Sequence, residues 1–420
     1  MDHLLAARWQ MGLSLAFHII FAVIGMAMPA MMVAAEAAWL RTGNAVYLDL
    51  TKRWAKGTAI FFAVGAVSGT VLSFELGLLW PRFMEFAGAI IGMPFSLEGF
   101  AFFLEAIFLG IYLYGWNRVG PRAHLFAGVM VALAGAFSGI FVVTANAWMN
   151  TPAGFRIVDG RVVDVDPIAA MLNPAAAAQV LHMLLAAYMA VGIAVAGIHA
   201  RLLLIDPTHR FHRAAFRVAL IVGLVPAVLQ PLSGDYTAKM VARTQPAKLA
   251  AMEAHFDTRA RAPIRIYFLE IPAALSVLAY GDPDATVVGL NDIPRANWPP
   301  VTAVHLAFQL MVGIGMWLAA IAVWAAWLAW RGRLQSRLLL RALVFSTPLG
   351  FIALEAGWMV TELGRQPWII HGFMRTSEAV TPMPGLGISL AVVTAIYIGL
   401  AVIVTFLIRR HVMETRPQTS

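Results

Sequence analysis

Long hydrophobic runs dominate the chain, and short polar segments separate them. Nine runs of about 20 residues or more lie near 11–35, 57–79, 97–116, 124–148, 178–203, 216–234, 302–329, 342–363 and 386–408. As a helix, each run is long enough to cross the hydrocarbon core of a bilayer, which is about 30 Å thick. The runs are continuous rather than alternating, which argues against a transmembrane β-barrel. The pattern predicts an all-α polytopic membrane protein of about nine transmembrane helices, with residues 1–420 forming one membrane-embedded domain.

Composition supports this class, because 60% of the residues are hydrophobic and only 12% are charged. Soluble domains carry about 25% charged residues. The first run is too long for the core of a signal peptide and is interpreted as a true span. The chain has no cysteine, which excludes iron–sulfur clusters, thiolate ligands, disulfides and covalent attachment of c-type haem.

Basic residues lie mainly in the connections on one side of the predicted bundle. Those connections and the C-terminal tail (Arg409, Arg410 and Arg416) hold 17 of the 30 lysines and arginines, whereas the short segments on the other side hold six. Short loops rich in Lys and Arg stay in the cytoplasm. The pattern therefore predicts an N-terminus outside and a C-terminus in the cytoplasm, and it explains the net charge of +8 without nucleic acid.

One long loop, residues 235–301, faces outward in this topology. It holds seven acidic and seven basic residues. Its segment 248–256 (KLAAMEAHF) has helical spacing, and a proline ends the segment FLEIP at 268–272. A loop of this length is usually functional or disordered. A solvated cap without a site remains the alternative on composition alone.

Two glutamates, Glu98 and Glu105, interrupt the third run. Ionisable groups inside a membrane are costly and are functional candidates by default. Seven residues make almost two helical turns, so both side chains lie on nearly one face, about 10 Å apart along the axis. That separation is too long for direct proton sharing and favours a relay through water or another group. The alternative is that each carboxylate is tied to its own buried partner.

Histidines His18 and His182 lie well inside separate runs, and Met311 lies inside a third. Neutral imidazole is the commonest metal ligand and a frequent haem ligand, and a Met/His pair ligates some low-spin haems. A lone buried histidine is more often only hydrogen-bonded, and most of the 21 methionines must serve packing. His124 and His305 lie at the ends of runs and are interpreted as interfacial. His199, near the end of the fifth run, is compatible with either an interfacial or a ligand role.

The run 342–363 carries Glu355 and Glu362, again seven residues apart, and continues into the segment GRQPW. Proline ends the helix there, and Trp368 is typical of a membrane interface. Arg365, beside Gln366, can neutralise a carboxylate or a haem propionate. The alternative is an interfacial cap that places a positive charge near a helix C-terminus.

Several motifs in order resemble those of subunit I of the cytochrome bd quinol oxidases, in the branch called cyanide-insensitive oxidase with a short quinol loop. They are RWQMGLSLAFH, EGFAFFLEA, LHMLLAAYMAVG, GDYTAKM followed by KLAAME, FQLMVGIGM and GWMVTELGRQPW. The similarity extends over nearly the whole chain. One departure is Gln309, which stands where many relatives have arginine.

The resemblance implies two haems b and one haem d, or a b-type haem at the oxygen site. It implies His182 and Met311 as axial ligands of the low-spin haem b. His18 and Glu362 would ligate the two high-spin haems, with His18 favoured for haem d. The cofactor contacts implied for the GRQPW segment are Arg365, Gln366 and Trp368.

For the reaction, the resemblance implies Lys248 and Glu253 as the quinol-binding and quinol-oxidising pair of the long loop. Trp358 would lie between haems and assist electron transfer. Glu105 would receive protons from the cytoplasmic side, and Glu98 would deliver them near the oxygen site. Direct ligation of a haem iron by Glu98 remains an alternative.

The implied function is that of the haem-containing subunit of a terminal quinol oxidase in the bacterial inner membrane. Ubiquinol or menaquinol would be oxidised at the outer face, and oxygen would be reduced to water with cytoplasmic protons, which builds a proton motive force without pumping. The implied partners are a second membrane subunit and, in some relatives, a small single-span subunit. Two alternatives stay open on the residues alone. One is a proton-coupled transporter, although no repeat or broken helix is evident in the sequence. The other is a low-spin haem electron carrier of a membrane dehydrogenase.

Overall fold

Nine helical spans, long and apolar enough to cross a membrane, occur in residues 2–266 and 269–413, the part of the chain that the computed structural model describes. They are α1 (His3–Thr42), α2 (Ala45–Leu79), α3 (Pro81–Tyr114), α4 (Pro121–Asn150), α6 (Ala176–Ile205), α7 (Arg210–Thr244), α10 (Val301–Trp330), α11 (Arg337–Ser346) together with α12 (Leu349–Leu363), and α14 (Leu386–Ile408). The predicted number of spans is confirmed. Arg416, counted in the tail for the topology, lies outside the described residues, and the orientation stays a prediction.

Most helices extend several residues beyond their apolar runs. The helix α1 has 40 residues, which corresponds to about 60 Å of length. It ends at Gly43, whose φ of +65° is the left-handed conformation that glycine adopts without steric cost. The next helix begins at once, because the Asn44 side chain accepts a hydrogen bond from the Val46 backbone N–H at 3.0 Å. At this junction a glycine and a polar cap, rather than the edge of a hydrophobic run, set the helix ends.

The eighth span is broken, so the expectation of unbroken spans was wrong here. The α-helix α11 ends at Ser346 and α12 begins at Leu349, with Thr347 and Pro348 between them. Proline has no backbone N–H and disfavours a helical residue before it, which interrupts the hydrogen-bond ladder. The glycine Gly197 of α6 lies directly against Thr347, so helix α6 packs closely at the break.

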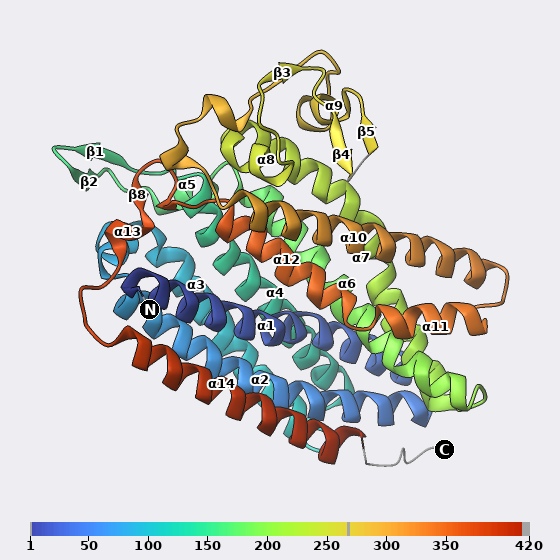
Figure 1. The fold of residues 1–420 in the computed structure, drawn as a ribbon. Coiled ribbons are helices and arrows are strands. Elements are labelled where there is room, and N and C mark those ends of the chain that lie inside the picture. The colour runs from blue at the N-terminus through green and yellow to red at the C-terminus, as the bar shows by residue number, and fades with distance from the viewer. Residues whose placement is uncertain (1, 267–268, 414–420) are drawn as a thin grey trace.

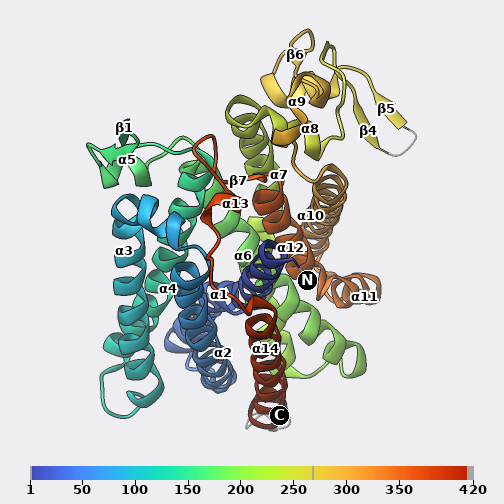
Figure 2. The same ribbon diagram turned by 60° about the vertical axis from the view of Figure 1, so that its left-hand side comes forward.

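Helix α1 runs through the centre of the bundle (Figure 1). It packs against α2, α4, α6 and α14, and α14 also contacts α2. Figure 2 shows α3 and α4 on one side of the molecule and α10 with α11 on the other. Helices α6, α7, α10 and α12 pack on one another in the second half. The main hydrophobic core joins α1, α2, α6, α7, α10 and α11.

Short elements cover one end of the bundle. They are the antiparallel strand pairs β1–β2 (Arg156–Val158, Arg161–Val163), β3–β6 (Arg259–Ala260, Thr286–Val287), β4–β5 (Ile264–Ile266, Leu269–Ile271) and β7–β8 (Trp368–Ile370, Met374–Arg375), and the helices α5 (Pro167–Met171), α8 (Pro246–Met252), α9 (Ala274–Tyr280), η1 (Leu290–Asp292), η2 (Arg295–Asn297) and α13 (Thr376–Ala379). A π-helical turn, η3 (Arg409–Met413), follows α14 at the other end.

The long loop folds over the end of the bundle where α7 ends and α10 begins (Figure 1). The predicted helical segment in 248–256 is confirmed in part, because α8 begins at Pro246 and ends at Met252. Of the FLEIP segment, Phe268 lies outside the described residues, and Leu269–Ile271 forms β5. The loop thus folds into a cap with its own small core, formed by α8, α9 and the ends of α7 and α10.

Candidate functional site

His18 of α1 is held by a serine in a way that leaves one ring nitrogen free. Its Nδ1 lies 3.0 Å from the Ser68 hydroxyl oxygen of α2. The Ser68 hydroxyl donates to the Val64 carbonyl at 3.0 Å, so it accepts its other hydrogen bond from Nδ1–H. Nε2 then carries the lone pair, as a metal-bound imidazole requires. A Cβ added at Gly69 would lie 2.9 Å from His18 Cε1, so only glycine leaves room for the ring.

His182 of α6 shows the same arrangement. Its Nδ1 lies 2.9 Å from the Ser233 hydroxyl oxygen of α7, and that hydroxyl donates to the Gln230 carbonyl at 2.8 Å. Nε2 is again the nitrogen left for a metal, with the Gln230 amide 3.2 Å away. Met311 comes from α10, which packs, like α6, against α7 and α12. A Cβ at Gly357 would lie 3.0 Å from Met311 Sδ, so a glycine accommodates the thioether as well.

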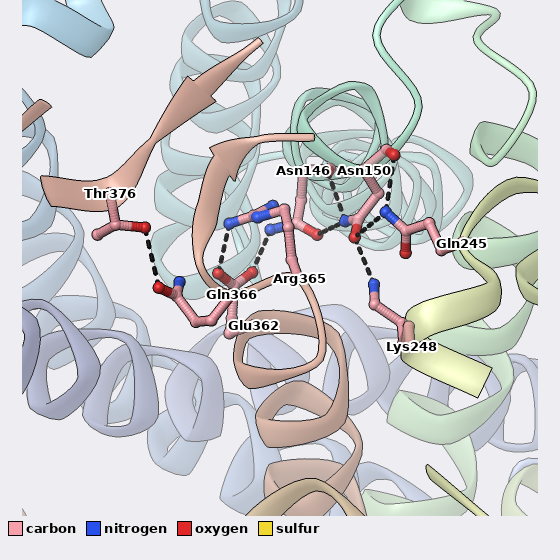
Figure 3. A network of polar contacts seen from close by, with 8 residues as sticks. All are labelled: Asn146, Asn150, Gln245, Lys248, Glu362, Arg365, Gln366 and Thr376. Carbon is pink, nitrogen blue, oxygen red and sulfur yellow. Dashed lines mark hydrogen bonds and ion pairs between the residues drawn. The ribbon is translucent and has the colours of Figure 1, made fainter. Parts of the chain in front are cut away.

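Glu362, near the C-terminal end of α12, is bonded through both carboxylate oxygens. Asn146 of α4 donates to Oε1 at 2.5 Å, and Arg365 donates to Oε2 at 2.6 Å (Figure 3). The Arg365 side chain is only 2% exposed, and within the described part of the chain its Nε and Nη1 have no hydrogen-bond partner. Buried guanidinium donors without acceptors are costly. They suit an additional anionic group such as a haem propionate, so the residues present fit the cofactor that the resemblance implies.

The same network reaches the long loop through α4. Asn150 donates from Nδ2 to the Asn146 carbonyl at 3.0 Å, and its Oδ1 accepts from Lys248 Nζ at 2.5 Å (Figure 3). The Gln245 amide donates to the Asn150 carbonyl at 2.7 Å. Burial and, to a smaller extent, the Arg365 charge lower the pKa of Lys248 to about 7, with the Glu362 charge acting in the opposite direction. A loop lysine therefore lies two asparagines away from a predicted haem ligand.

Glu253 follows α8 immediately and lies at the edge of the same cap. Its side chain is 6% exposed, and no described residue forms a hydrogen bond with Oε2. Burial raises the pKa of Glu253 to about 7. A carboxyl group with this pKa can accept and release a proton at neutral pH. The predicted pair Lys248 and Glu253 is thus buried in one segment, with both pKa values near 7.

The remaining residues of the GRQPW segment lie beside this network. The Gln366 Oε1 accepts a hydrogen bond from Thr376 at 2.9 Å (Figure 3). Trp368 opens β7, and the Arg375 guanidinium stacks 4.8 Å from the centre of its ring. Trp358, one turn before Glu362, packs partly buried against the main core. The polar chemistry of Arg365, Gln366 and Trp368 therefore collects at the end of the bundle that the loop covers.

The two carboxylates of α3 face α4 and α1. Ser138 of α4 donates to Glu98 Oε1 at a long 3.4 Å. Glu105 is 5% exposed and lies against glycines: a Cβ at Gly135 would be 3.4 Å from its carboxyl carbon, and one at Gly25 would be 3.7 Å from its Oε1. The predicted stripe is confirmed in the sense that both carboxylates point into the same helix interface.

Several polar residues of these sites were missed from the sequence. Asn146, Asn150 and Gln245 join the loop to Glu362, and the only signal was two asparagines four residues apart at the end of a hydrophobic run. His124 lies at the end of a span as predicted, but the sequence did not show that it is 3% exposed and bonded to Glu36. Within the described residues, no group of three or more His, Cys, Asp or Glu side chains could hold a metal ion.

Comparison with known families decides the class. The family model for cytochrome bd terminal oxidase subunit I matches residues 6–416. The chain belongs to this family. It is similar to the putative cytochrome bd menaquinol oxidase subunit I of Bacillus subtilis (36% identity, covering 99% of this chain and 98% of the relative) and to the cytochrome bd ubiquinol oxidase subunit 1 of the same organism (31%, 99% and 94%).

The structure agrees with the sequence comparison. The chain superposes on the bd oxidase of Geobacillus thermodenitrificans with a TM-score of 0.93 and 39% identity, covering 99% of both chains. This family member is accordingly a multi-pass protein of the bacterial cytoplasmic membrane and a subunit of a terminal quinol oxidase, a quinol:oxygen oxidoreductase that uses haem. The transporter and the dehydrogenase carrier are set aside.

Proposed function

We propose that this chain carries all three haems and the quinol site of its oxidase. His182 with Met311 would hold the low-spin haem b, and His18 and Glu362 would each hold one of the other two, with haem d at His18. The observation that carries the proposal is the polar network from Lys248 through Asn150 and Asn146 to Glu362, because it puts the loop and a haem ligand at one site. When bound, the haems supply one-electron transfer and the place where oxygen is reduced.

In this proposal the loop residues handle the quinol. Lys248, whose ammonium donates to Asn150, also binds a quinol oxygen and orients the ring. Glu253 accepts the hydroxyl proton and releases it on the outer side. The carboxyl group must be ionised to accept that proton, and its pKa is raised to about 7. At saturating quinol, the rate of quinol oxidation should therefore rise with pH through about 7 and stay low below it.

On the inner side, Glu105 receives cytoplasmic protons and Glu98 delivers them toward the oxygen site. Proton release outside and proton uptake inside separate charge without a pump. A second membrane subunit is part of the proposed complex, and a small single-span subunit is compatible with it. The similar chains are described as acting with menaquinol or with ubiquinol, and this chain is proposed to use one of these two.

Spectra of the purified complex test the assignment. We expect a low-spin b signal together with a high-spin haem that binds carbon monoxide. His182→Ala should remove the first signal, and His18→Ala should remove carbon monoxide binding. Loss of the low-spin signal in His18→Ala, or carbon monoxide binding that survives in it, would contradict the assignment.

A further inference from the structure

A buried glutamate and a buried histidine form a pair that the function above does not use. Glu36 of α1 and His124 of α4 lie toward the end of the bundle opposite the long loop. Glu36 is 0% exposed and His124 is 3% exposed. Glu36 Oε1 and His124 Nδ1 are 2.7 Å apart. Two ionisable groups held inside a membrane protein without contact to solvent call for a function.

The hydrogen bonds of His124 place one mobile proton in this pair. Its Nε2 lies 2.9 Å from the Tyr112 backbone carbonyl, which can only accept, so Nε2 carries a hydrogen. The short contact between Nδ1 and Glu36 Oε1 then holds one further proton. The pair is either an imidazolium with a carboxylate or an imidazole with a carboxylic acid. In both forms it can take up a proton at one atom and give one up at another.

The side chain of Tyr112 leads from this pair toward the carboxylates of α3. Glu98, Glu105 and Tyr112 follow one another at intervals of seven residues, so they lie on nearly the same face of the helix. The Tyr112 ring packs against His124, with 4.4 Å between the ring centres, and its hydroxyl lies near the Glu36 carboxylate. Among the described residues, neither Tyr112 Oη nor Glu36 Oε2 has a hydrogen-bond partner, and both atoms are buried. A donor and an acceptor without partners thus lie near each other where the stripe on α3 meets the pair.

Helix α4 presents glycines opposite this stripe. A Cβ at Gly128 would lie 2.6 Å from the Tyr112 ring, and one at Gly135 would lie 3.4 Å from the Glu105 carboxyl carbon. A side chain at Gly128 would therefore displace the Tyr112 ring, whereas Gly135 lets helix α4 lie in van der Waals contact with the Glu105 carboxyl group. The two glycines are seven residues apart, as are the groups they face.

Helix α1 adds an acceptor next to Glu105. Pro29 has no backbone N–H, so the Gly25 carbonyl four residues earlier has no helical donor. A Cβ at Gly135 would lie 3.2 Å from this oxygen, and Glu105 lies against Gly25 itself. A carbonyl oxygen without a helical donor, next to a carboxyl group, can hold a bridging water. Proton transfer from Tyr112 to Glu105 requires bridging water, because the two residues are roughly 10 Å apart along the helix axis.

We propose that Glu36 and His124 are the proton-loading pair of the relay, and that Tyr112 passes protons from this pair to Glu105. The inference rests on the relay of Glu105 and Glu98 proposed above. A cytoplasmic proton binds the pair, and Glu36 Oε2 gives one proton to Tyr112 Oη. The tyrosine releases its own hydroxyl proton through water to the Glu105 carboxylate. The pair and Tyr112 thereby regain their starting protonation, and Glu105 has gained one proton. A charged group near the pair is exposed Lys52, whose Nζ lies 5.3 Å from the centre of the Trp116 ring that packs on His124.

The test is proton uptake by the assembled complex. Fully reduced enzyme is mixed with oxygen, and a pH dye is followed together with haem absorbance. Glu36→Gln and Tyr112→Phe should each slow proton uptake about tenfold, a barrier increase of about 1.4 kcal/mol, while haem content and quinol-driven haem reduction stay as in the wild type. Glu36→Asp should restore most of the rate, because it returns the acid.

Glu75→Gln is the matched control. Glu75 is also a buried glutamate, 4% exposed and bonded to Gln10 at 2.9 Å, but it lies on α2, outside the relay. It should leave proton uptake unchanged. If the Glu36→Gln complex does not assemble, Tyr112→Phe decides, because it removes only the hydroxyl.

Parallel measurement of Glu105→Gln separates the two proposals. Slow uptake in Glu105→Gln with wild-type uptake in Glu36→Gln and Tyr112→Phe would overturn the loading pair and leave the relay intact. Wild-type uptake in Glu105→Gln would overturn the relay itself. Slow proton uptake in Glu36→Gln with wild-type uptake in Tyr112→Phe would show that protons leave the pair by a route other than Tyr112. That result would also overturn this inference.

Discussion

Replacing Asn150 tests how the network controls the loop lysine. The Lys248 ammonium is 3% exposed and donates to Asn150 Oδ1 at 2.5 Å. A hydrogen bond to a charged group contributes about 1.5–3 kcal/mol, and one pKa unit corresponds to about 1.4 kcal/mol. Asn150→Leu has a similar volume but no acceptor. It should therefore lower the pKa of Lys248 by roughly one to two units from its value of about 7.

The sign follows from which form the hydrogen bond stabilises. Asn150 stabilises the protonated amine, so its loss makes Lys248 neutral at pH 7. If the ammonium binds quinol, the KM for quinol at pH 7 should rise by a factor of about ten, and wild-type KM should return near pH 5–6. The assay is steady-state quinol oxidation between pH 5 and 8 in detergent. Haem spectra of each sample check that the complex is intact.

A neighbouring substitution serves as the control. Gln245→Leu removes a different donor to Asn150 and keeps the Lys248 hydrogen bond, so its KM profile should not move along the pH axis. A KM profile of Asn150→Leu that coincides with the wild type would refute the reasoning. So would an equal shift in both variants, because it would trace the effect to packing rather than to the lysine.

Three further predictions concern single residues. Gly69→Ala should displace His18 and lose carbon monoxide binding, whereas Gly77→Ala on the same helix, with open space around it, should keep it; equal spectra would argue against a tight fit. Met311→Leu should convert the low-spin haem to high-spin, and an unchanged reduced spectrum would exclude this ligand. Glu253→Ala should abolish quinol oxidation, and with it the rise of the rate with pH, while artificial electron donors still reduce the haems. Normal quinol kinetics in this variant would count against the quinol site in the loop.

The number and class of the spans were predictable, because the apolar runs alone determine what a bilayer accepts. The break at Thr347 and Pro348 was not predicted, although the proline is visible in the sequence. A proline can bend a transmembrane helix without ending it. Close packing of Gly197 against Thr347, a contact between distant segments, accompanies the actual break.

In the site, too, features within one helix were predictable and contacts between helices were not. Spacing within one helix put Glu98 and Glu105 on one face, and the structure agrees. The partners of Asn146 and His124 were not predictable, because they lie on other helices far away in the sequence. Asn146 bonds a residue 216 positions later, and His124 bonds one 88 positions earlier. Such pairs depend on how the helices pack, which the local pattern does not encode.

The network around Asn146 and Asn150 also has a consequence for biogenesis. Helix α4 is synthesised and inserted well before α8 and α12, and Asn146 and Asn150 lack these partners until residues 248 and 362–365 arrive. Pairing between segments so distant in sequence forms late. The network that joins the loop to Glu362 is therefore complete only when the eighth span is in place, and a chain released earlier lacks its α12 part. Assembly order alone would then keep an unfinished subunit from drawing electrons out of the quinol pool.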